Sequence, residues 1–131
     1  AGTGYCYEEK DGEFHTPGTI NILVFTNKAL TDSAMVKAIM TITEAKTAAL
    51  QDWKVESTKT ISKYNTQIDH SLAKETNTSA TGTATDGIIL TINTNGDVLT
   101  DAGSYSLFGD TLAKAVYLGV QRALENAIGT E

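Results

Sequence analysis

The sequence lacks the features that would indicate a nucleic-acid-binding or membrane protein. Its 131 residues carry 10 basic and 16 acidic side chains, for a net charge of -6. Phosphate binding requires clustered Lys and Arg, and no such cluster is present, so we expect no nucleic-acid partner. Apolar runs are only a few residues long and no signal-peptide pattern occurs, so we expect no membrane span and a cytoplasmic location.

Cysteine and histidine are almost absent, which limits disulfide and metal chemistry. The single Cys6 cannot form an internal disulfide, and without a neighbouring histidine it is interpreted as a small apolar residue. His15 and His70 are the only histidines and have no neighbours with the spacing of a zinc site. We therefore expect no metal site, and nothing in the sequence requires a resident cofactor.

Two apolar segments predict strands. Residues 20–25 are almost continuously apolar and β-branched, which is typical of a strand buried on both faces. Residues 88–92 predict a second strand. Asn95-Gly96 then predicts a hairpin turn that returns the chain as residues 97–100.

Two long amphipathic segments predict helices over this sheet. The first extends to Trp53, with Thr31 as N-cap and Asp32 at the positive end of the dipole, and the second covers 108–128. The predicted fold is one domain over 1–131 with two helices packed on a sheet in a sandwich, of the α/β class or alternatively α+β. The expected buried stripes are Met35, Ile39, Ile42, Ala45, Ala49 and Trp53 in the first helix, and Leu112, Ala115, Val116, Gly119, Val120, Ala123, Leu124 and Ala127 in the second.

A polar stretch at 54–80 interrupts this pattern. Connections of this length in compact domains are more often functional or disordered than mere spacers. We interpret it as insertion-like, forming either a short strand near Thr60 or a mobile loop over the site.

The most informative segment is 81–87, with the sequence Thr-Gly-Thr-Ala-Thr-Asp-Gly. Glycine lets a backbone approach a ligand closely, while Thr and Asp supply donors, acceptors and a base. A polar, glycine-containing loop that leads into an apolar strand is typical of a functional loop on a rigid support. The same composition also makes ordinary turns, so both interpretations stay open at this point.

Four segments occur in an order that resembles the adenosylcobinamide amidohydrolase family. They are GTINI at 18–22, TEAK-x-x-AL at 43–50, TGT-x-TD at 81–86 and a Gly-acid-x-L-x-x-AV helix at 109–116. The resemblance covers roughly 17–124, with a gap for the insertion-like stretch. Members of the family carry a further N-terminal segment. We therefore expect this chain to be the C-terminal portion of a longer protein, whose missing segment could supply catalytic groups. The partner of the chain would then be this N-terminal segment or, alternatively, another copy in a homo-oligomer.

The resemblance implies a reaction and a set of catalytic residues. The reaction is hydrolysis of the amide that joins aminopropanol to a propionate arm of the corrin ring, giving adenosylcobyric acid. The substrate is then a small-molecule corrinoid, and its cobalt is not a cofactor of the protein. Thr83, Thr85 and Asp86 match the family motif, with Asp86 as a base for a threonine or for water, and backbone N–H groups near Gly82 and Gly87 as oxyanion donors. Alternatively, the threonines cap a turn and Asp86 accepts backbone hydrogen bonds.

Three further residues are candidates beside this loop. Glu44 and Lys46 match the TEAK segment but lie about 200° apart around a helix, so only one can face the site. Glu44 follows the apolar Ile42, and partial burial there would suit general acid–base work. Lys46 is expected to bind substrate or, if Glu44 is the residue that faces the site, to lie in solvent or in a structural ion pair. The strand residue Asn21 is expected to bind substrate or to anchor a neighbouring loop. We expect the loop and the start of the first strand to form one cleft beside the first helix.

The last family motif departs from its usual pattern. A histidine and a glutamate normally precede the final helix, but here Tyr105 and Asp110 occupy those positions. Losing the imidazole removes the best proton shuttle at neutral pH, although Tyr105 could donate a hydrogen bond to substrate. The sequence therefore favours an amidohydrolase, with a non-catalytic corrinoid- or ligand-binding module, or a hydrolase of another amide, as alternatives. We expect Asp86→Asn to fold normally and to lose most hydrolysis.

Overall fold

The computed structural model describes residues 9–10, 13–14, 19–53, 80–83 and 85–128. The predictions for Cys6, His15, His70 and residues 54–79 lie outside these described residues. Near the N-terminus, β1 (Glu9–Lys10) and β2 (Glu13–Phe14) form a short antiparallel pair.

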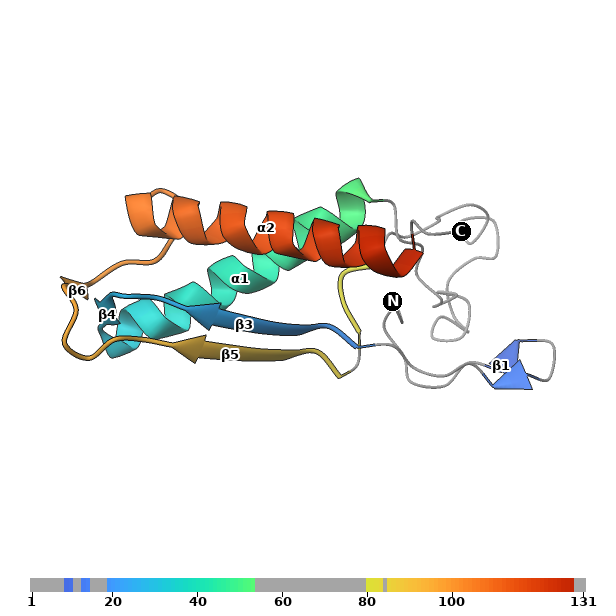
Figure 1. Ribbon diagram of the computed structural model, residues 1–131, viewed down its shortest axis with the longest axis horizontal. Coiled ribbons are helices and arrows are strands. Elements are labelled where there is room, and N and C mark those ends of the chain that lie inside the picture. The colour runs from blue at the N-terminus through green and yellow to red at the C-terminus, as the bar shows by residue number, and fades with distance from the viewer. Residues whose placement is uncertain (1–8, 11–12, 15–18, 54–79, 84, 129–131) are drawn as a thin grey trace, which may run out of the picture.

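Two separate pairs of parallel strands follow one another along the chain, and together they are called the ladder. β3 (Asn21–Phe25) pairs in parallel with β5 (Gly87–Thr91). Further along both segments, β4 (Ala29–Leu30) pairs in parallel with β6 (Val98–Leu99). Figure 1 shows the second pair at the end of the molecule toward which β3 and β5 run. The N-terminal ends of β3 and β5 therefore meet at one end of the sheet, and this end carries the polar loop.

The turn predicted at Asn95-Gly96 forms, but it does not make a hairpin. The Gly96 N–H donates to the Asn93 carbonyl at 2.9 Å, which closes the turn. The Asn93 N–H donates to the Lys28 carbonyl at 3.0 Å and holds the chain beside the β3–β4 connection. The predicted antiparallel return was wrong because the buried strand β4 offers β6 a parallel partner that extends the existing ladder.

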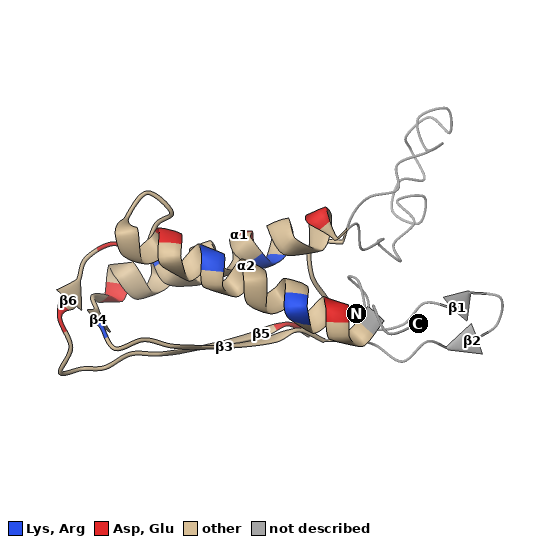
Figure 2. Ribbon diagram, turned by 45° about the horizontal axis from the view of Figure 1, so that its top comes forward, with Lys and Arg blue, Asp and Glu red and all other residues tan. Residues whose placement is uncertain are grey.

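Two helices pack on this sheet, as predicted, and both lie on the same face of it. α1 (Asp32–Asp52) begins at Thr31, whose Oγ1 accepts from the Ala34 N–H at 3.3 Å, so the predicted N-cap is confirmed. α2 (Leu107–Ile128) begins one residue before its predicted start. Figure 2 shows both helices on the same side of β3 and β5. No helix in the described part of the chain is long and apolar enough to cross a bilayer.

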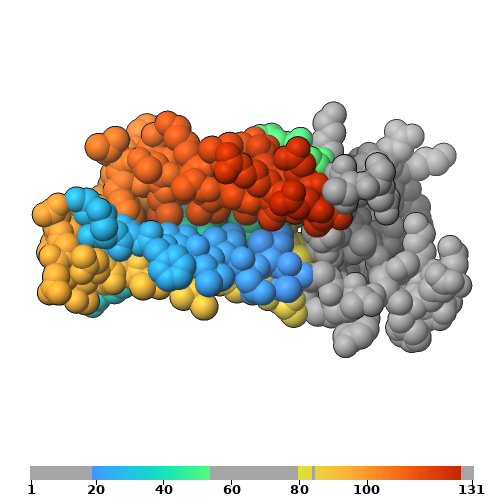
Figure 3. All heavy atoms as spheres, viewed as in Figure 1, coloured from blue at the N-terminus to red at the C-terminus, as the bar shows by residue number. Residues whose placement is uncertain are grey.

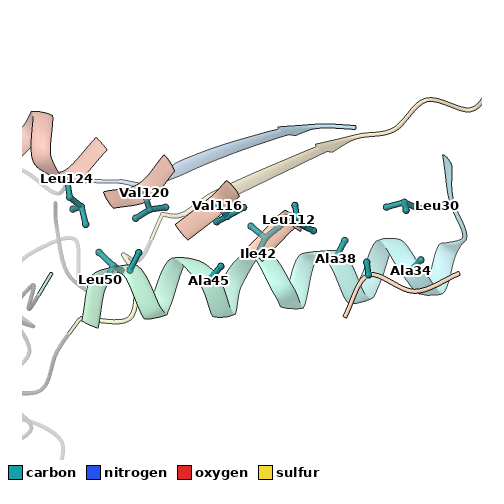
Figure 4. Packing of buried hydrophobic residues seen from close by; sticks show 12 residues of the cluster. Leu30, Ala34, Ala38, Ile42, Ala45, Leu50, Leu112, Val116, Val120 and Leu124 are labelled. Carbon is teal, nitrogen blue, oxygen red and sulfur yellow. The ribbon is translucent and has the colours of Figure 1, made fainter. Parts of the chain in front are cut away.

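The core lies between α1, α2 and the inner face of the sheet (Figure 4). Ile42 and Leu50 are its largest fully buried apolar side chains. The predicted α1 stripe is partly wrong, because Ile39 is 38% exposed. The buried side of α1 was predicted from the positions of the larger side chains. The face that contacts α2 and the sheet is instead rich in alanine, which permits close packing. The buried residues of α1 are Ala34, Ala38, Thr41, Ile42, Ala45, Lys46, Ala49 and Leu50.

The opposite face of the sheet is open in the described structure. Side chains of β3 alternate between inward and exposed positions, and Leu23 and Phe25 are 57% and 74% exposed. Ile89 of β5 is exposed on the same ladder. The prediction that β3 is buried on both faces was therefore wrong, since the two helices cover only one of them.

The α2 stripe divides into two rows. The larger side chains are buried as predicted, whereas the small ones at intervening positions are exposed. That part of the prediction was wrong because the small residues face a groove beside β3. The buried row is Leu112, Val116, Val120 and Leu124, and the exposed row is Ala115, Gly119, Ala123 and Ala127.

Candidate functional site

The polar loop before β5 lies against the start of β3. The Gly87 N–H donates to the Ile20 carbonyl at 3.0 Å, and the Thr19 hydroxyl donates to the Thr85 carbonyl at 2.9 Å. Because β3 and β5 are parallel, their N-terminal ends bring these distant segments together. The predicted proximity of the loop and the first strand is confirmed.

The Asp86 carboxylate is the centre of this site. Its Oδ2 accepts from Lys46 Nζ at 2.5 Å and from the Thr83 N–H at 3.0 Å. Its Oδ1 accepts from the Thr83 hydroxyl at 2.5 Å and from the Ile20 N–H at 3.1 Å. The donors come from α1, from the loop and from the residue before β3. One carboxylate therefore fastens three segments together, and we refer to Lys46, Thr83 and Asp86 as the carboxylate cluster.

The cluster is largely shielded from water. The side chains of Lys46 and Asp86 are 9% and 14% exposed. Burial acts to raise the pKa of Asp86, but hydrogen bonds from Lys46 and Thr83, together with the Lys46 charge, outweigh it and hold the pKa below the usual 3.8. Asp86 is therefore ionised at neutral pH. A carboxylate has about four acceptor positions, and here all four bonds are made within the protein.

A side chain would be crowded at two glycine positions around the cluster. A Cβ on Gly82 would lie 2.5 Å from Asp86 Oδ2 and 2.6 Å from Lys46 Nζ, and a Cβ on Gly87 would lie 2.9 Å from Asn21 Oδ1. The expected close approach of backbone to the site is therefore present. The Gly87 N–H itself donates to the Ile20 carbonyl within the sheet, so the oxyanion donors expected near Gly82 and Gly87 would be other N–H groups of the loop, and that role stays a prediction.

Only one of the two candidate threonines contacts the carboxylate. Thr83 donates its hydroxyl to Asp86, which is the arrangement of a nucleophile beside a base. Thr85 is exposed, and its described hydrogen bonds are made by its backbone N–H and carbonyl. The geometry therefore distinguishes two hydroxyls that the motif alone could not.

Lys46, not Glu44, faces the site. Only one of the two was expected to do so, and Glu44 is exposed, so its expected partial burial was wrong. The sequence left open a structural ion pair for one of the two residues, but it did not identify Asp86 as the partner of Lys46. A signal for it exists, because Lys46 lies four residues after Ile42 and four before Leu50 and so falls in the buried stripe. A lysine in such a stripe needs a buried partner of opposite charge.

The residues of the last motif lie elsewhere. Tyr105 is fully exposed in the loop before α2, and Asp110 forms an ion pair with Lys114 at 2.7 Å. The Thr41 hydroxyl anchors this loop to α1 by donating to the Ala102 carbonyl at 2.7 Å. Figure 1 shows this loop at the end of the molecule where β4 and β6 lie, whereas β3 and β5 begin at the other end. Tyr105 is therefore not brought to the carboxylate cluster.

A groove of about 700 Å³ runs between β3 and α2. One end of it reaches Thr19, Ile20 and Asn21, so Asn21 lies both on the groove and beside Gly87. The groove lies beside α2, whereas the sequence placed the cleft beside the first helix. In the described residues, no group of three or more His, Cys, Asp or Glu side chains is placed to hold a metal ion.

These observations define the chain as an α/β protein in which a threonine, an ionised carboxylate and a lysine meet at the N-terminal ends of two parallel strands. The sequence model of one family, described as adenosylcobinamide amidohydrolase, matches residues 1–66 and 58–131. The chain belongs to this family.

One curated relative is an uncharacterized protein of Methanocaldococcus jannaschii, which is 39% identical over 107 residues. The match covers 82% of this chain but only 36% of the relative, so the chain spans about a third of that protein's length. No solved structure matches the chain significantly.

Proposed function

We propose that this chain contributes the amide-hydrolysing site that converts adenosylcobinamide to adenosylcobyric acid and aminopropanol. The observation that carries the proposal is the 2.5 Å hydrogen bond from the Thr83 hydroxyl to the ionised Asp86 carboxylate. The description of the family suggests the substrate, and the described residues provide a hydroxyl with an adjacent proton acceptor. The proposal places the reaction in the cytoplasm and requires no resident metal or cofactor.

In this mechanism Thr83 is the nucleophile. Its oxygen bonds to the amide carbon while its proton passes to Asp86, and the proton then reaches the nitrogen as the carbon–nitrogen bond breaks. Aminopropanol leaves, and water cleaves the resulting threonine ester to give the free carboxylic acid. Lys46 keeps Asp86 ionised and fixed in position. Asp86 is a weak base, because its bonds to Lys46 and Thr83 stabilise the ionised form. Protonated Asp86 is therefore short-lived and passes its proton on to the leaving amine.

A binding module is the second candidate, and one observation favours it. Every acceptor position of Asp86 is filled by Lys46, Thr83 and Ile20, which is also what a purely structural carboxylate would show. In that case the chain would hold a corrinoid without cleaving it. Hydrolysis of a different amide would use the same Thr83–Asp86 pair and differ only in the ligand that the surrounding surface accepts.

The experiment incubates the chain with adenosylcobinamide and separates the corrinoid products by liquid chromatography with mass detection. Adenosylcobyric acid and free aminopropanol in equal amounts are the expected products. Binding of the corrinoid without any product would replace the hydrolase with the binding module. If the chain shows neither binding of the corrinoid nor any product, both candidates are overturned. The longer M. jannaschii relative is assayed in parallel, and turnover by it alone would place essential catalytic groups outside this chain.

A further inference from the structure

The groove between β3 and α2 follows the edge of the strand. Seven consecutive residues, 19–25, line it. Successive side chains of a strand point to opposite faces, so a feature that touched only one face would be lined by alternate residues. Figure 3 shows β3, in blue, running along the lower side of α2, in orange to red. The groove is therefore open to the backbone of β3.

The hydrogen-bond register identifies the backbone groups at that edge. The Gly87 N–H donates to the Ile20 carbonyl, and the Thr26 N–H donates to the Thr91 carbonyl at 3.0 Å. In a parallel ladder only alternate residues of a strand bond to a given neighbour, so residues 20, 22, 24 and 26 face β5. The N–H and carbonyl groups of Asn21, Leu23 and Phe25 point to the outer edge. Among the described residues, β3 pairs only with β5.

The opposite wall of the groove is built from small residues of α2. Ala115, Gly119, Ala123 and Ala127 recur every four residues, line the groove and are exposed. An exposed helix face is normally polar, so a continuous apolar row is unusual on a surface that faces only water. Small side chains leave space between the helix and the plane of the sheet, and this space lies where the next strand beyond β3 would run.

We propose that this groove receives one further β-strand, which pairs with the outer edge of β3 beneath α2. Two strands alone make a marginal sheet, so a further strand beside β3 would stabilise this one. The open edge of β3 and the row of small residues on α2 are complementary to an extended segment. The added strand would pass beside Thr19 and Asn21 and so reach the end of the sheet that holds the carboxylate cluster.

The strand is assigned to a segment that the longer M. jannaschii relative has outside the matched region. The match to the M. jannaschii relative covers 36% of that protein, which leaves enough chain to supply it. A second copy of this chain fits less well. Two β3 edges related by a two-fold axis would keep both helix layers on the same face of a continuous sheet. Figure 3 shows α2 alongside β3 on the side away from β5, so two copies paired through their β3 edges would place both α2 helices in the same space.

The test is amide hydrogen exchange, followed by NMR, in this chain and in the full-length M. jannaschii relative. In this chain, the N–H groups of Asn21, Leu23 and Phe25 should exchange at least about a hundredfold faster than those of Ile22 and Val24. In the relative, the residues aligned with all five should be protected alike. Equal protection of all five in this chain alone would overturn the proposal, and so would an unprotected edge in the relative. Protection that rises with concentration, together with a dimer in sedimentation, would identify a second copy instead.

A pair of lysine substitutions in the relative locates the strand beneath α2. One is placed at the position aligned with Ala123, which lines the groove, and the other at the position aligned with Leu118, which is 51% exposed on α2 and outside the groove. The groove lysine should lower protection at the aligned β3 edge at least tenfold, and the control lysine should not. Equal effects of the two lysines would contradict the proposed location. If the groove variant fails to fold, as judged by circular dichroism, the comparison of the unsubstituted proteins still decides.

Discussion

Two ion pairs at opposite ends of the ladder have nearly the same geometry and very different surroundings. Lys46 and Asp86 are 2.5 Å apart and almost enclosed, with side chains 9% and 14% exposed. Lys28 and Asp97 are 2.6 Å apart, but their side chains are 34% and 82% exposed. Distance alone would rank the pairs as equals. Burial separates them, because water screens the exposed pair while the enclosed charges have only each other and their hydrogen bonds.

The comparison also shows where chemistry is concentrated in this fold. The buried pair includes a third group, since Thr83 donates both its N–H and its hydroxyl to Asp86. The exposed pair only joins the β3–β4 connection to the start of β6. A carboxylate that holds three segments together and also contacts a hydroxyl has both a structural and a chemical role. Substitutions at Asp86 will therefore change folding and activity together.

The largest effect on stability is expected for Asp86→Asn. This change leaves the Lys46 charge buried without its partner and should lower the free energy of unfolding by about 3–5 kcal/mol. The expectation of normal folding, drawn from the sequence, is therefore revised. Asp97→Asn is the matched control and should leave stability nearly unchanged. Urea unfolding of both variants measures the difference, and equal losses would show that burial does not distinguish the two pairs.

Ile42 and Ile39 are a buried and an exposed isoleucine on the same helix, α1, and their substitution by alanine should have different effects on stability. Ile42 is completely buried, so Ile42→Ala should lower the free energy of unfolding by about 3 kcal/mol through lost burial and a cavity. Ile39 is 38% exposed, and Ile39→Ala should cost less than about 1 kcal/mol. Thermal and urea unfolding provide the measurement. A larger loss for Ile39 than for Ile42 would mean that α1 is rotated from its observed orientation.

A smaller effect on the free energy of unfolding is expected when the pH is lowered. The pKa of Asp86 in the folded chain is held below 3.8, so its contribution to stability is complete above that pH and is lost as the pH falls through the lowered value. The stability difference between wild type and Asp86→Asn should therefore be constant from pH 7 to about pH 5 and should narrow below pH 3.8. Unfolding curves at a series of pH values test this. A difference that narrowed near neutral pH would show that the pKa is raised instead.

The sequence predicted the elements of the fold better than their pairing. Thr31 and the apolar period of α2 marked the helices correctly, because capping and periodicity are local properties. Asn95-Gly96 correctly marked a turn, but local signals do not say which strand the following residues will join. Residues 98–99 pair with β4 and not with the strand before the turn, because β4 offers a parallel partner whose position depends on the packing of the whole sheet.

The site was predicted in its parts but not in its connections. The loop residues Thr83 and Asp86 were identified from their types and their order, and the structure places them in contact. Lys46 was expected to bind substrate or to form a structural ion pair, and its place within a buried stripe favours a partner inside the protein. Tyr105 was grouped with the same site because a motif shows order along the chain and not distance in space. The loop that contains Tyr105 lies at the other end of the ladder because α2 begins there and runs back along the strands (Figure 1).

The most direct test of the account compares Thr83→Val, Thr83→Ser and Thr91→Val in hydrolysis of adenosylcobinamide. Thr91→Val is the matched control, because Thr91 is exposed at the far end of β5. Thr83→Val should reduce the rate of adenosylcobyric acid formation at least about a hundredfold, while Thr83→Ser retains measurable turnover and Thr91→Val stays at the wild-type rate. Circular dichroism and corrinoid binding confirm that each variant is folded. Wild-type turnover by a folded Thr83→Val variant would contradict the assignment of Thr83 and its bond to Asp86 as the reacting pair.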